Sequence, residues 1–269
     1  MHTSRAIRFA RYVALGDSST EGVGDPDGNG GTRGWSRRLA QRIADLQGAL
    51  EYSNLAVRGW TTREILEGQV GPALALRPDL ATVFSGTNDL VSRRLDVAAV
   101  TRDMETMQGA LIDGGATVLT FTLPVRSAVL PLARLLTPRI HAINEAIRTA
   151  AASTGAVLID FSVCPIGSDA RIWSADRIHV NEFGHRRIAE ALADALHLPG
   201  SDDSWCGVPP PAPRKSVAEW LAGEADWTRS HLLPWIARGM RTHSPDSTID
   251  CQRPSVVETL QAAPLSSRR

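Results

Sequence analysis

The sequence is poor in cysteine, since its 269 residues include only Cys164, Cys206 and Cys251. The three are far apart and odd in number, so they fit neither a disulfide framework nor the paired Cys-x-x-Cys pattern of a metal site. Unpaired thiols are typical of a reducing compartment. Nothing else in the chain needs a catalytic cysteine.

An excess of charge of either sign is also lacking, because Lys and Arg together number 29 and Asp and Glu together number 29. Nucleic acids and anionic membrane surfaces attract proteins with a basic excess, so the composition favours neither as a partner. No run approaches the ~18 consecutive apolar residues of a membrane span. Residues 1–10 include basic side chains but no apolar stretch of signal-peptide length, which makes the cytoplasm the expected location.

Short apolar segments alternate with stretches of helical periodicity over residues 12–196. The segments are apolar on both faces, as in a parallel sheet covered by helices on both sides. We predict strands at residues 12–15, 52–57, 80–84, 117–122 and 157–161, and helices at residues 35–46, 61–76, 97–113, 138–153 and 181–196. Repeated strand–helix units predict a doubly wound α/β fold, in which ligands bind beyond the carboxyl ends of the strands.

The pattern changes after Leu198. Residues 199–215 include a run of prolines and are predicted to be a stiff extended linker. Residues 216–240 predict an amphipathic helical arm, with Ser216 as N-cap and Pro234 ending or kinking the helix. Residues 241–269 are rich in Ser, Pro and polar side chains and are predicted to be disordered. The catalytic domain would then be residues 1–198.

Tryptophan is concentrated in the predicted arm. Three of the seven tryptophans lie there, namely Trp220, Trp227 and Trp235. They either dock the arm on the core or form a lid or a partner surface.

Residues 12–22, YVALGDSSTEG, are an apolar run that ends in a sharp polar turn. The pattern predicts a buried strand that delivers Ser18 to the sheet edge, where its hydroxyl can act as a nucleophile. Gly, Asp and Ser are also favoured in turns, so the tripeptide alone is more often structural than catalytic. Its interpretation depends on whether a base, an orienting carboxylate and oxyanion donors exist elsewhere in the chain.

A base and an orienting carboxylate occur together just before the last predicted helix. Asp176 and His179 are three residues apart. This spacing allows the carboxylate to accept a hydrogen bond from Nδ1–H, which leaves Nε2 to take a serine proton. Asp176 and His179 could instead be an Asp–His pair on the surface, without a catalytic role, or part of a metal site. A metal needs further ligands, and the only nearby candidate, His185, falls where the helix can simply expose it.

Candidate oxyanion donors follow two other predicted strands. Asn88 comes after the third strand, and its carboxamide can donate to a developing oxyanion. Gly59 comes after the second strand, where the missing side chain lets the backbone N–H approach a substrate. Each signal is weak alone, but four such segments in order at the ends of strands and in the last loop rarely arise by chance.

Together these segments resemble the SGNH/GDSL hydrolase family, whose sequence blocks carry Ser, Gly, Asn and His. The resemblance spans residues 11–198 and rests on Gly16-Asp17-Ser18, Gly59, Gly86-Thr87-Asn88-Asp89 and Asp176-Arg177-Ile178-His179. It implies a flavodoxin-like three-layer α/β/α sandwich with a five-stranded parallel sheet, and neither a metal nor an organic cofactor.

The resemblance also assigns roles to individual residues. It implies that Ser18 is the nucleophile, His179 the base and Asp176 its orienter. The implied oxyanion donors are the Ser18 amide, Gly59 and Asn88. Ser19 stands where the family usually has a bulky residue, a departure that bears on the shape of the pocket.

Two glycine-rich patterns are better explained as loops. Residues 25–30 begin like a calcium-binding loop, but Ser36 occupies the twelfth position, where calcium needs a bidentate glutamate. Gly22-Val23-Gly24 lacks the spacing of a dinucleotide-binding loop. A glycine-rich loop beside the active site accounts for both.

The sequence therefore predicts a serine ester hydrolase that acts on a small-molecule ester through an acyl-enzyme. Acyl transfer to an alcohol and removal of acetyl groups from a carbohydrate would use the same residues, and a non-catalytic binding module is a third alternative. The predicted pocket walls are residues 22–33, 58–62, 88–94 and 124–136. The last segment suits either an acyl-chain site or core under a loop, and the oligomeric state stays open.

Overall fold

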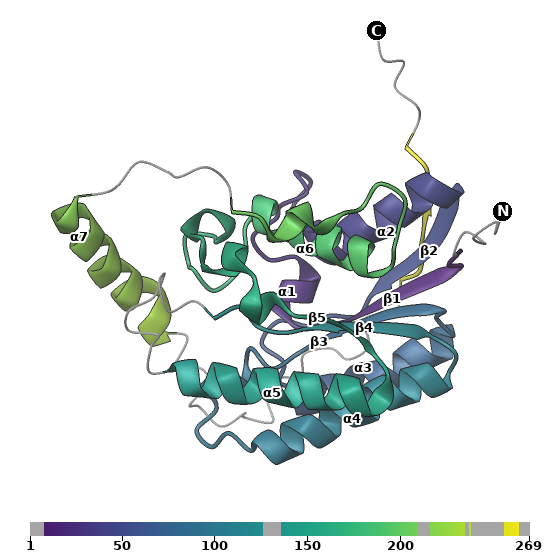
Figure 1. The fold of residues 1–269 in the computed structure, drawn as a ribbon, viewed down its shortest axis with the longest axis horizontal. Coiled ribbons are helices and arrows are strands. Elements are labelled where there is room, and N and C mark those ends of the chain that lie inside the picture. Colours follow the sequence, from purple (N-terminus) through teal and green to yellow (C-terminus); the bar gives the residue numbers. More distant parts are fainter. Residues whose placement is uncertain (1–7, 126–135, 209–215, 235–236, 238–255, 264–269) are drawn as a thin grey trace, which may run out of the picture.

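A six-stranded sheet forms the centre of the molecule, in the order β5-β4-β3-β1-β2-β6 (Figure 1). The computed structural model describes residues 8–125, 136–208, 216–234, 237 and 256–263. The strands are β1 (Arg11–Gly16), β2 (Ala49–Asn54), β3 (Leu80–Phe84), β4 (Thr117–Phe121), β5 (Val157–Ile159) and β6 (Glu258–Gln261). Strands β1 to β5 pair in parallel. Strands β1, β3 and β4 are short, largely apolar segments, as a sheet covered on both faces requires.

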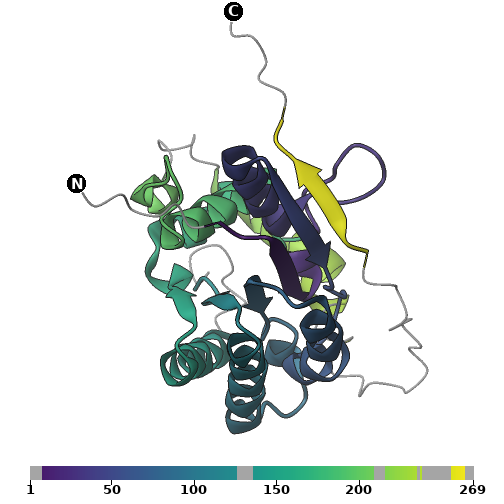
Figure 2. The same cartoon turned by 90° about the vertical axis from the view of Figure 1, so that its right-hand side faces the viewer.

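Helices cover both faces of the sheet and give it three layers (Figures 1 and 2). Helices α2 (Gly34–Gln47) and α6 (Glu182–Ala195) pack together on one face. Helices α3 (Thr62–Leu76), α4 (Val97–Asp113) and α5 (Thr137–Thr154) cover the other. The predicted α/β/α sandwich is confirmed, and the parallel strands follow the flavodoxin-like order 2-1-3-4-5.

The sixth strand corrects the prediction of a five-stranded, all-parallel sheet. Strand β6 pairs antiparallel with the edge strand β2, so part of the tail predicted to be disordered is ordered (Figure 2). Leu260 is only 4% exposed there, and Glu258 pairs with Arg37 of α2. A four-residue segment with one apolar side chain carries no strand signal of its own, and the partner edge supplies the missing hydrogen bonds.

The beginning of the predicted linker is also folded onto the domain. A 3-10 turn, η6 (Asp203–Cys206), follows α6. The ring of Trp205 meets that of Phe161 edge-on at 5.2 Å, and its Nε1–H donates to Asp194 at 3.1 Å. Burial of the Trp205 ring, with its N–H hydrogen-bonded, therefore holds this segment in a turn on the domain, although the prolines that follow favour an extended linker. Residues 209–215, which include the prolines, lie outside the described residues.

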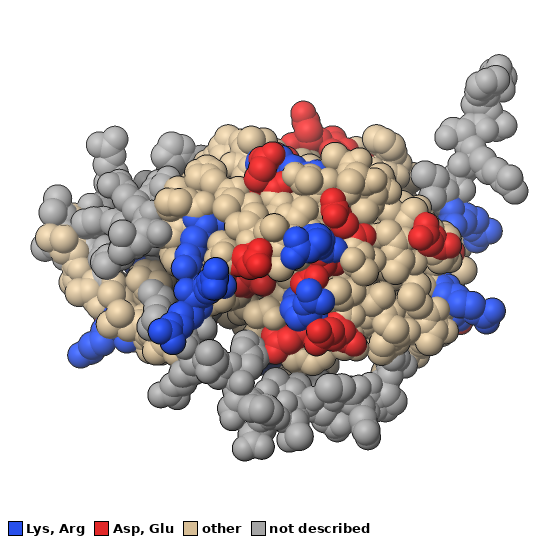
Figure 3. Space-filling view, turned by 90° about the horizontal axis from the view of Figure 1, so that it is seen from below, with Lys and Arg blue, Asp and Glu red and all other residues tan. Residues whose placement is uncertain are grey.

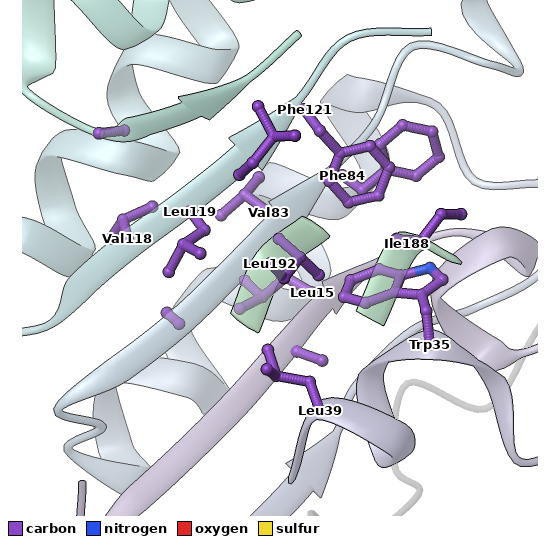
Figure 4. Close-up of a cluster of buried hydrophobic side chains, with 14 of the residues drawn as sticks. Leu15, Trp35, Leu39, Val83, Phe84, Val118, Leu119, Phe121, Ile188 and Leu192 are labelled. Carbon is purple, nitrogen blue, oxygen red and sulfur yellow. The ribbon is translucent and has the colours of Figure 1, made fainter. Parts of the chain in front are cut away.

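Aromatic side chains fill the core beneath the carboxyl ends of the strands (Figure 4). Phe121 stacks on Phe84 with ring centroids 4.3 Å apart, and it meets Trp35 of α2 edge-on at 5.2 Å. Trp35 is fully buried. Such aromatic pairs are rigid and tightly packed, so the core directly below the loops at this edge of the sheet is rigid.

On the face formed by α3, α4 and α5, the acidic and basic side chains of the described residues are interspersed (Figure 3). Arg63 of α3, for example, pairs with Asp103 of α4 at 2.7 Å. Within the described residues, none of the helices has the length and apolar character needed to cross a membrane.

Candidate active site

The end of β1 is fixed by a buried side-chain amide and by close packing. Gln69 of α3 accepts a hydrogen bond from the Gly16 N–H and donates one to the Gly16 carbonyl, both at 2.8 Å. A Cβ atom on Gly16 would lie 2.1 Å from Oγ1 of Thr20 and 2.7 Å from the carbonyl oxygen of Phe84, so only glycine fits. Sequence reasoning missed Gln69, whose signal was a glutamine on an otherwise apolar helix face.

Ser18 begins a four-residue helix directly after this strand. Helix α1 (Ser18–Glu21) is capped by Asp17, whose carboxylate accepts a hydrogen bond from the Ser19 N–H at 3.0 Å. The Ser18 N–H lies in the first turn, where backbone N–H groups have no partner within the helix. Ser18 therefore presents both its hydroxyl and its amide at the carboxyl edge of the sheet.

Ser18, His179 and Asp176 form one hydrogen-bonded series. Nε2 of His179 lies 2.8 Å from Oγ of Ser18, and Nδ1 lies 2.6 Å from Oδ2 of Asp176. An ionised carboxylate can only accept, so Nδ1 carries the ring proton and Nε2 accepts from the serine hydroxyl. Residues 161 positions apart in the chain are thus brought together in the predicted arrangement.

Asp176 is held in its ionised form. Burial by itself raises the pKa of Asp176, but the side-chain and backbone hydrogen bonds from His179 outweigh burial and lower that pKa to about 2. Its Oδ1 accepts from the N–H groups of Ile178 at 2.9 Å and His179 at 3.0 Å. The carboxylate is therefore charged at neutral pH and fixes the orientation of the imidazole.

Gly59 lies beside the Ser18 segment. The N–H groups of Leu55 and Val57 donate to Ala14 and Gly16 of β1, at 2.9 and 3.1 Å, although β2 itself ends at Asn54 and not at residue 57 as predicted. Gly59 has a φ of 81°, a left-handed conformation that glycine adopts without strain. The preceding residue, Arg58, pairs with Glu21 of α1 at 2.7 Å.

Asn88 connects three loops at the same edge. Its Nδ2 group donates to Oδ2 of Asp17 at 3.1 Å and to the Trp60 carbonyl at 3.0 Å. Strands β1 and β3 are neighbours, and the chain leaves them toward opposite ends of the sheet. Ser18 and Asn88 thus flank the topological switch point, where open α/β sheets bind their ligands.

An apolar cavity of about 70 Å³ lies next to Ser18 and His179. Its walls come from the carboxyl ends of β3 and β4, the turns after β5 and the beginning of α6. Its apolar wall residues include Phe84, Phe121, Leu123, Ile166, Ile172 and Ile188. The cavity is therefore suited to a hydrocarbon group attached to a carbonyl that lies at Ser18.

Only part of the predicted pocket wall lines this cavity. Leu90 and Pro124 do, but residues 22–33 and 58–62 do not, and residues 126–135 lie outside the described residues. The glycine-rich loop is instead bound to α2, where Arg38 donates two hydrogen bonds to the Asp25 carboxylate, at 2.7 and 2.9 Å. Arg38 thus binds both oxygens of the carboxylate that a calcium-binding loop would use as a ligand.

The sequence model of the GDSL-like lipase/acylhydrolase family matches residues 14–187, which is more than half of the chain. The chain belongs to this family. The match agrees with the resemblance carried by the Ser18, Gly59, Asn88 and Asp176–His179 segments. Membership of this family makes the protein a hydrolase. None of the curated proteins is a significant match.

Several solved structures share the fold of this chain. TesA is 23% identical over 69% of this chain and 97% of its own, with a TM-score of 0.58. A lipase/acylhydrolase from Enterococcus faecalis is 24% identical over 70% of this chain and 95% of its own, with a TM-score of 0.56. A catalytic mutant of Axe2, an acetylxylan esterase from Geobacillus stearothermophilus, is 14% identical over 72% of this chain and 97% of its own, with a TM-score of 0.58.

Two further carboxyl groups lie buried beneath the site. Burial raises the pKa of Asp17 to about 7, against the lowering effect of the Ser19 N–H and of His179. Burial also raises the pKa of Asp89, against hydrogen bonds from the amide and hydroxyl of Thr62. Asp17 is therefore partly protonated near neutral pH, directly beneath Ser18.

His185 differs from the prediction, because it is completely buried instead of exposed on the helix. Its Nδ1 accepts from the Trp35 N–H at 3.2 Å, and its Nε2 lies 3.0 Å from the Val23 carbonyl, to which it donates. Both ring nitrogens are thus used within the protein, and burial lowers the pKa of His185 to about 4. Among the residues with described coordinates, no group of three or more His, Cys, Asp or Glu side chains is arranged to hold a metal ion.

Proposed function

We propose that this hydrolase is a serine esterase that cleaves esters of short to medium acyl groups through an acyl-enzyme on Ser18. The observation that carries the proposal is the hydrogen-bonded series from Ser18 through His179 to Asp176 beside an apolar cavity. A serine with a base and an orienting carboxylate is the arrangement that activates a hydroxyl for attack on a carbonyl.

The acylation step uses each member of this series. Oγ of Ser18 attacks the ester carbonyl carbon while Nε2 of His179 takes its proton. Asp176, ionised because its pKa is about 2, stabilises the imidazolium that forms. The tetrahedral intermediate then expels the alcohol, which takes its proton from His179, and the acyl group stays on Ser18.

Deacylation repeats the same proton transfers with water. His179 takes a proton from a water molecule that attacks the acyl-enzyme, and the proton returns to Ser18 as the carboxylic acid leaves. The N–H groups of Ser18 and Gly59 and the carboxamide of Asn88 are the donors proposed for the oxyanion in both steps. Asn88 serves only if the substrate oxygen replaces one of its present acceptors, Asp17 or Trp60.

The cavity favours an acyl group larger than acetyl. The volume of about 70 Å³ is the space open to the centre of a water-sized sphere, and one water-sized group occupies about 10–15 Å³ of it. The cavity therefore takes on the order of five methylene-sized groups. An acetyl group would leave most of this apolar surface unfilled. Burial of each methylene contributes about 0.8 kcal/mol, so rates should rise with chain length until the cavity is full.

A chain-length series of p-nitrophenyl esters, from acetate to dodecanoate, tests the substrate class. We expect kcat/KM to peak between about four and eight carbons. A maximum at acetate, together with release of acetate from acetylated sugars, would support the carbohydrate acetylesterase instead. Addition of an acceptor alcohol with product analysis distinguishes acyl transfer from hydrolysis.

Ser18→Ala tests the nucleophile. The variant should lose ester hydrolysis and labelling by a fluorophosphonate probe, because the alanine has no hydroxyl to acylate. Ser19→Ala is the matched control and should still be labelled, since Nε2 of His179 faces Ser18. Folded wild-type protein that is neither labelled nor active would contradict the proposal.

A further inference from the structure

The helical arm lies outside the family match, yet it contacts the turn that carries His179 and Asp176. The arm consists of α7 (Val217–Trp227) and a π-helical turn, η7 (Thr228–Leu232). Figure 1 shows α7 at one end of the molecule, with its C-terminal end turned toward the sheet layers. Trp227 ends α7, is 3% exposed, and donates a hydrogen bond from its indole N–H to the Asp176 carbonyl.

The same tryptophan contacts the next residue of the turn. The guanidinium carbon of Arg177 lies 5.3 Å from the centroid of the Trp227 ring, within cation–π range. Arg177 has a φ of 52°, a left-handed conformation that is disfavoured for a residue with a side chain. Such a conformation persists where the surrounding contacts hold it. Trp227 therefore holds two consecutive residues of the turn through two different kinds of contact.

The position of this turn decides the geometry of the catalytic pair. Oδ1 of Asp176 binds the His179 N–H at 3.0 Å, and the Ser174 N–H binds the His179 carbonyl at 2.9 Å. Asp176 and His179 thus move with the turn as one unit. A shift of the Asp176 carbonyl would carry its carboxylate, and hence the imidazole, away from Ser18.

Two of the described side chains of the arm are buried, namely Trp227 and Leu232. Leu232 is 4% exposed, whereas Leu221 on α7 and Leu233 are 55% and 56% exposed. The arm begins with the predicted cap, since Ser216 and Glu219 exchange hydrogen bonds at 2.7 and 3.3 Å. Trp227 is not among the residues that line the cavity, so its effect on a substrate would be indirect.

We infer that Trp227 is a positioning residue for the Asp176–His179 pair, and that the arm is an intramolecular brace for the catalytic turn. The inference rests on the proposed function for its effect on rate, but not for its effect on the geometry of the turn. It assigns the arm a part in catalysis that the family match at residues 14–187 does not include.

Kinetics of the whole 269-residue chain test the effect on rate. Trp227→Ala should lower kcat by roughly 10- to 100-fold, the usual result of misplacing a reacting group by a fraction of an ångström to an ångström. Trp227→Phe keeps a ring under Arg177 but loses the N–H, and should lower kcat by about two- to tenfold. KM should change less than kcat for both, because Trp227 itself does not line the cavity. Leu221→Ala, on the exposed face of the same helix, is the matched control and should behave as wild type.

Proton NMR tests the geometry without relying on activity. The short bond between Nδ1 of His179 and Asp176 should give a proton signal at very low field, assigned by its loss in Asp176→Asn. We expect this signal to shift or broaden in Trp227→Ala and to stay unchanged in Leu221→Ala. If Trp227→Ala does not fold, the Phe variant decides the outcome by both readouts.

The two possible failures are distinguishable. An unchanged kcat and an unchanged low-field signal in folded Trp227 variants would overturn the brace while the esterase stands. A wild-type protein that hydrolyses no ester would overturn the proposed function, and the NMR signal would still decide whether Trp227 orders the turn.

Discussion

Nδ2 of Asn88 lies 3.1 Å from Oδ2 of Asp17 and 3.0 Å from the carbonyl oxygen of Trp60. One carboxamide therefore ties the loop after β3 to the turn that presents Ser18 and to the loop that contains Gly59. The same side chain is the one expected to donate to an oxyanion. Its structural and chemical roles can be separated by experiment.

Asn88→Ala should lower kcat by roughly 10²- to 10³-fold with a small change in KM, since an oxyanion donor acts mainly in the transition state. Steady-state kinetics with the best p-nitrophenyl ester measure the effect. Asn54→Ala is the matched control, because Asn54 also joins segments through a carboxamide, bound to the Thr20 carbonyl at 2.8 Å. A variant that loses stability but keeps its kcat would show that Asn88 only fastens the loops.

The pH dependence of stability should contain a contribution from Asp17. Its pKa rises from 3.8 in the unfolded chain to about 7 in the folded protein, chiefly through burial. The folded state therefore binds the proton more tightly, so this contribution is fully present below about pH 4 and is lost as the pH rises through about 7. The loss is at most about 1.4 kcal/mol per pH unit.

Asp17→Asn removes this titration. Urea unfolding of both proteins at intervals from pH 4 to pH 8 should give a free-energy difference that shifts in favour of the variant as the pH rises. The variant also keeps only one of the two acceptor oxygens of Asp17, so either the Ser19 N–H or Nδ2 of Asn88 loses its partner, which lowers the stability of the variant. Parallel profiles for the two proteins would contradict the raised pKa of Asp17.

His185 should act in the opposite direction. Burial lowers its pKa from 6.5 to about 4, so the unfolded state binds the proton more tightly. The contribution of His185 is therefore present above about pH 6.5 and is lost as the pH falls toward about 4. In the folded protein, Nδ1 of His185 accepts a hydrogen bond from the Trp35 N–H. Protonation would put the second N–H of the ring on Nδ1, so that two donors would face each other.

His185→Gln cannot take up this proton, and its stability should fall less than that of wild type between pH 6.5 and pH 4. Denaturant unfolding at several pH values measures the difference. Asp17 and His185 oppose each other in this range, so the wild-type profile alone can look flat. Equal slopes for His185→Gln and wild type would show that the buried ring does not resist protonation.

Strand β6 should contribute to stability and should also protect an edge. Leu260→Ala should lower the free energy of unfolding by about 2–3 kcal/mol, as expected for truncating a buried leucine. Val257→Ala, which is 38% exposed just before the strand, should change it by less than about 1 kcal/mol.

Removal of residues 256–269 would uncover the edge of β2, and exposed edges pair with other chains. The truncated protein should therefore associate in a concentration-dependent way, as measured by light scattering. A truncated protein with the same mass distribution as the full chain at all concentrations would contradict a protective role for β6.

Much of the fold and the candidate site was predictable because the signals were local. Buried strands such as residues 80–84 are almost entirely apolar, and the helix over residues 97–113 was predicted with the bounds that the structure has. Parallel strands bring their carboxyl ends to one edge, so segments that follow them must meet there. That rule placed Ser18 and Asn88 at the same edge without knowledge of any contact.

Other features depend on partners that are remote in sequence. Trp227 is 51 residues from the Asp176 carbonyl that it binds, Gln69 is 53 residues from Gly16, and His185 is 150 residues from Trp35. Glu258–Gln261 forms a strand only because the β2 edge offers it hydrogen bonds. None of these side chains carries a periodicity or spacing that reveals its partner.

The sequence by itself determined the layered α/β architecture, the order of the site segments and the residue types for acyl chemistry. Hydrophobic periodicity and strand direction fix these within short stretches of chain. Only the tertiary structure decided the sixth strand, the burial of His185, the hydrogen bonds of Gln69 to Gly16 and the contact of the arm with the catalytic turn. Their reason is physical, because a buried polar group needs a partner, and packing alone selects which distant residue supplies it.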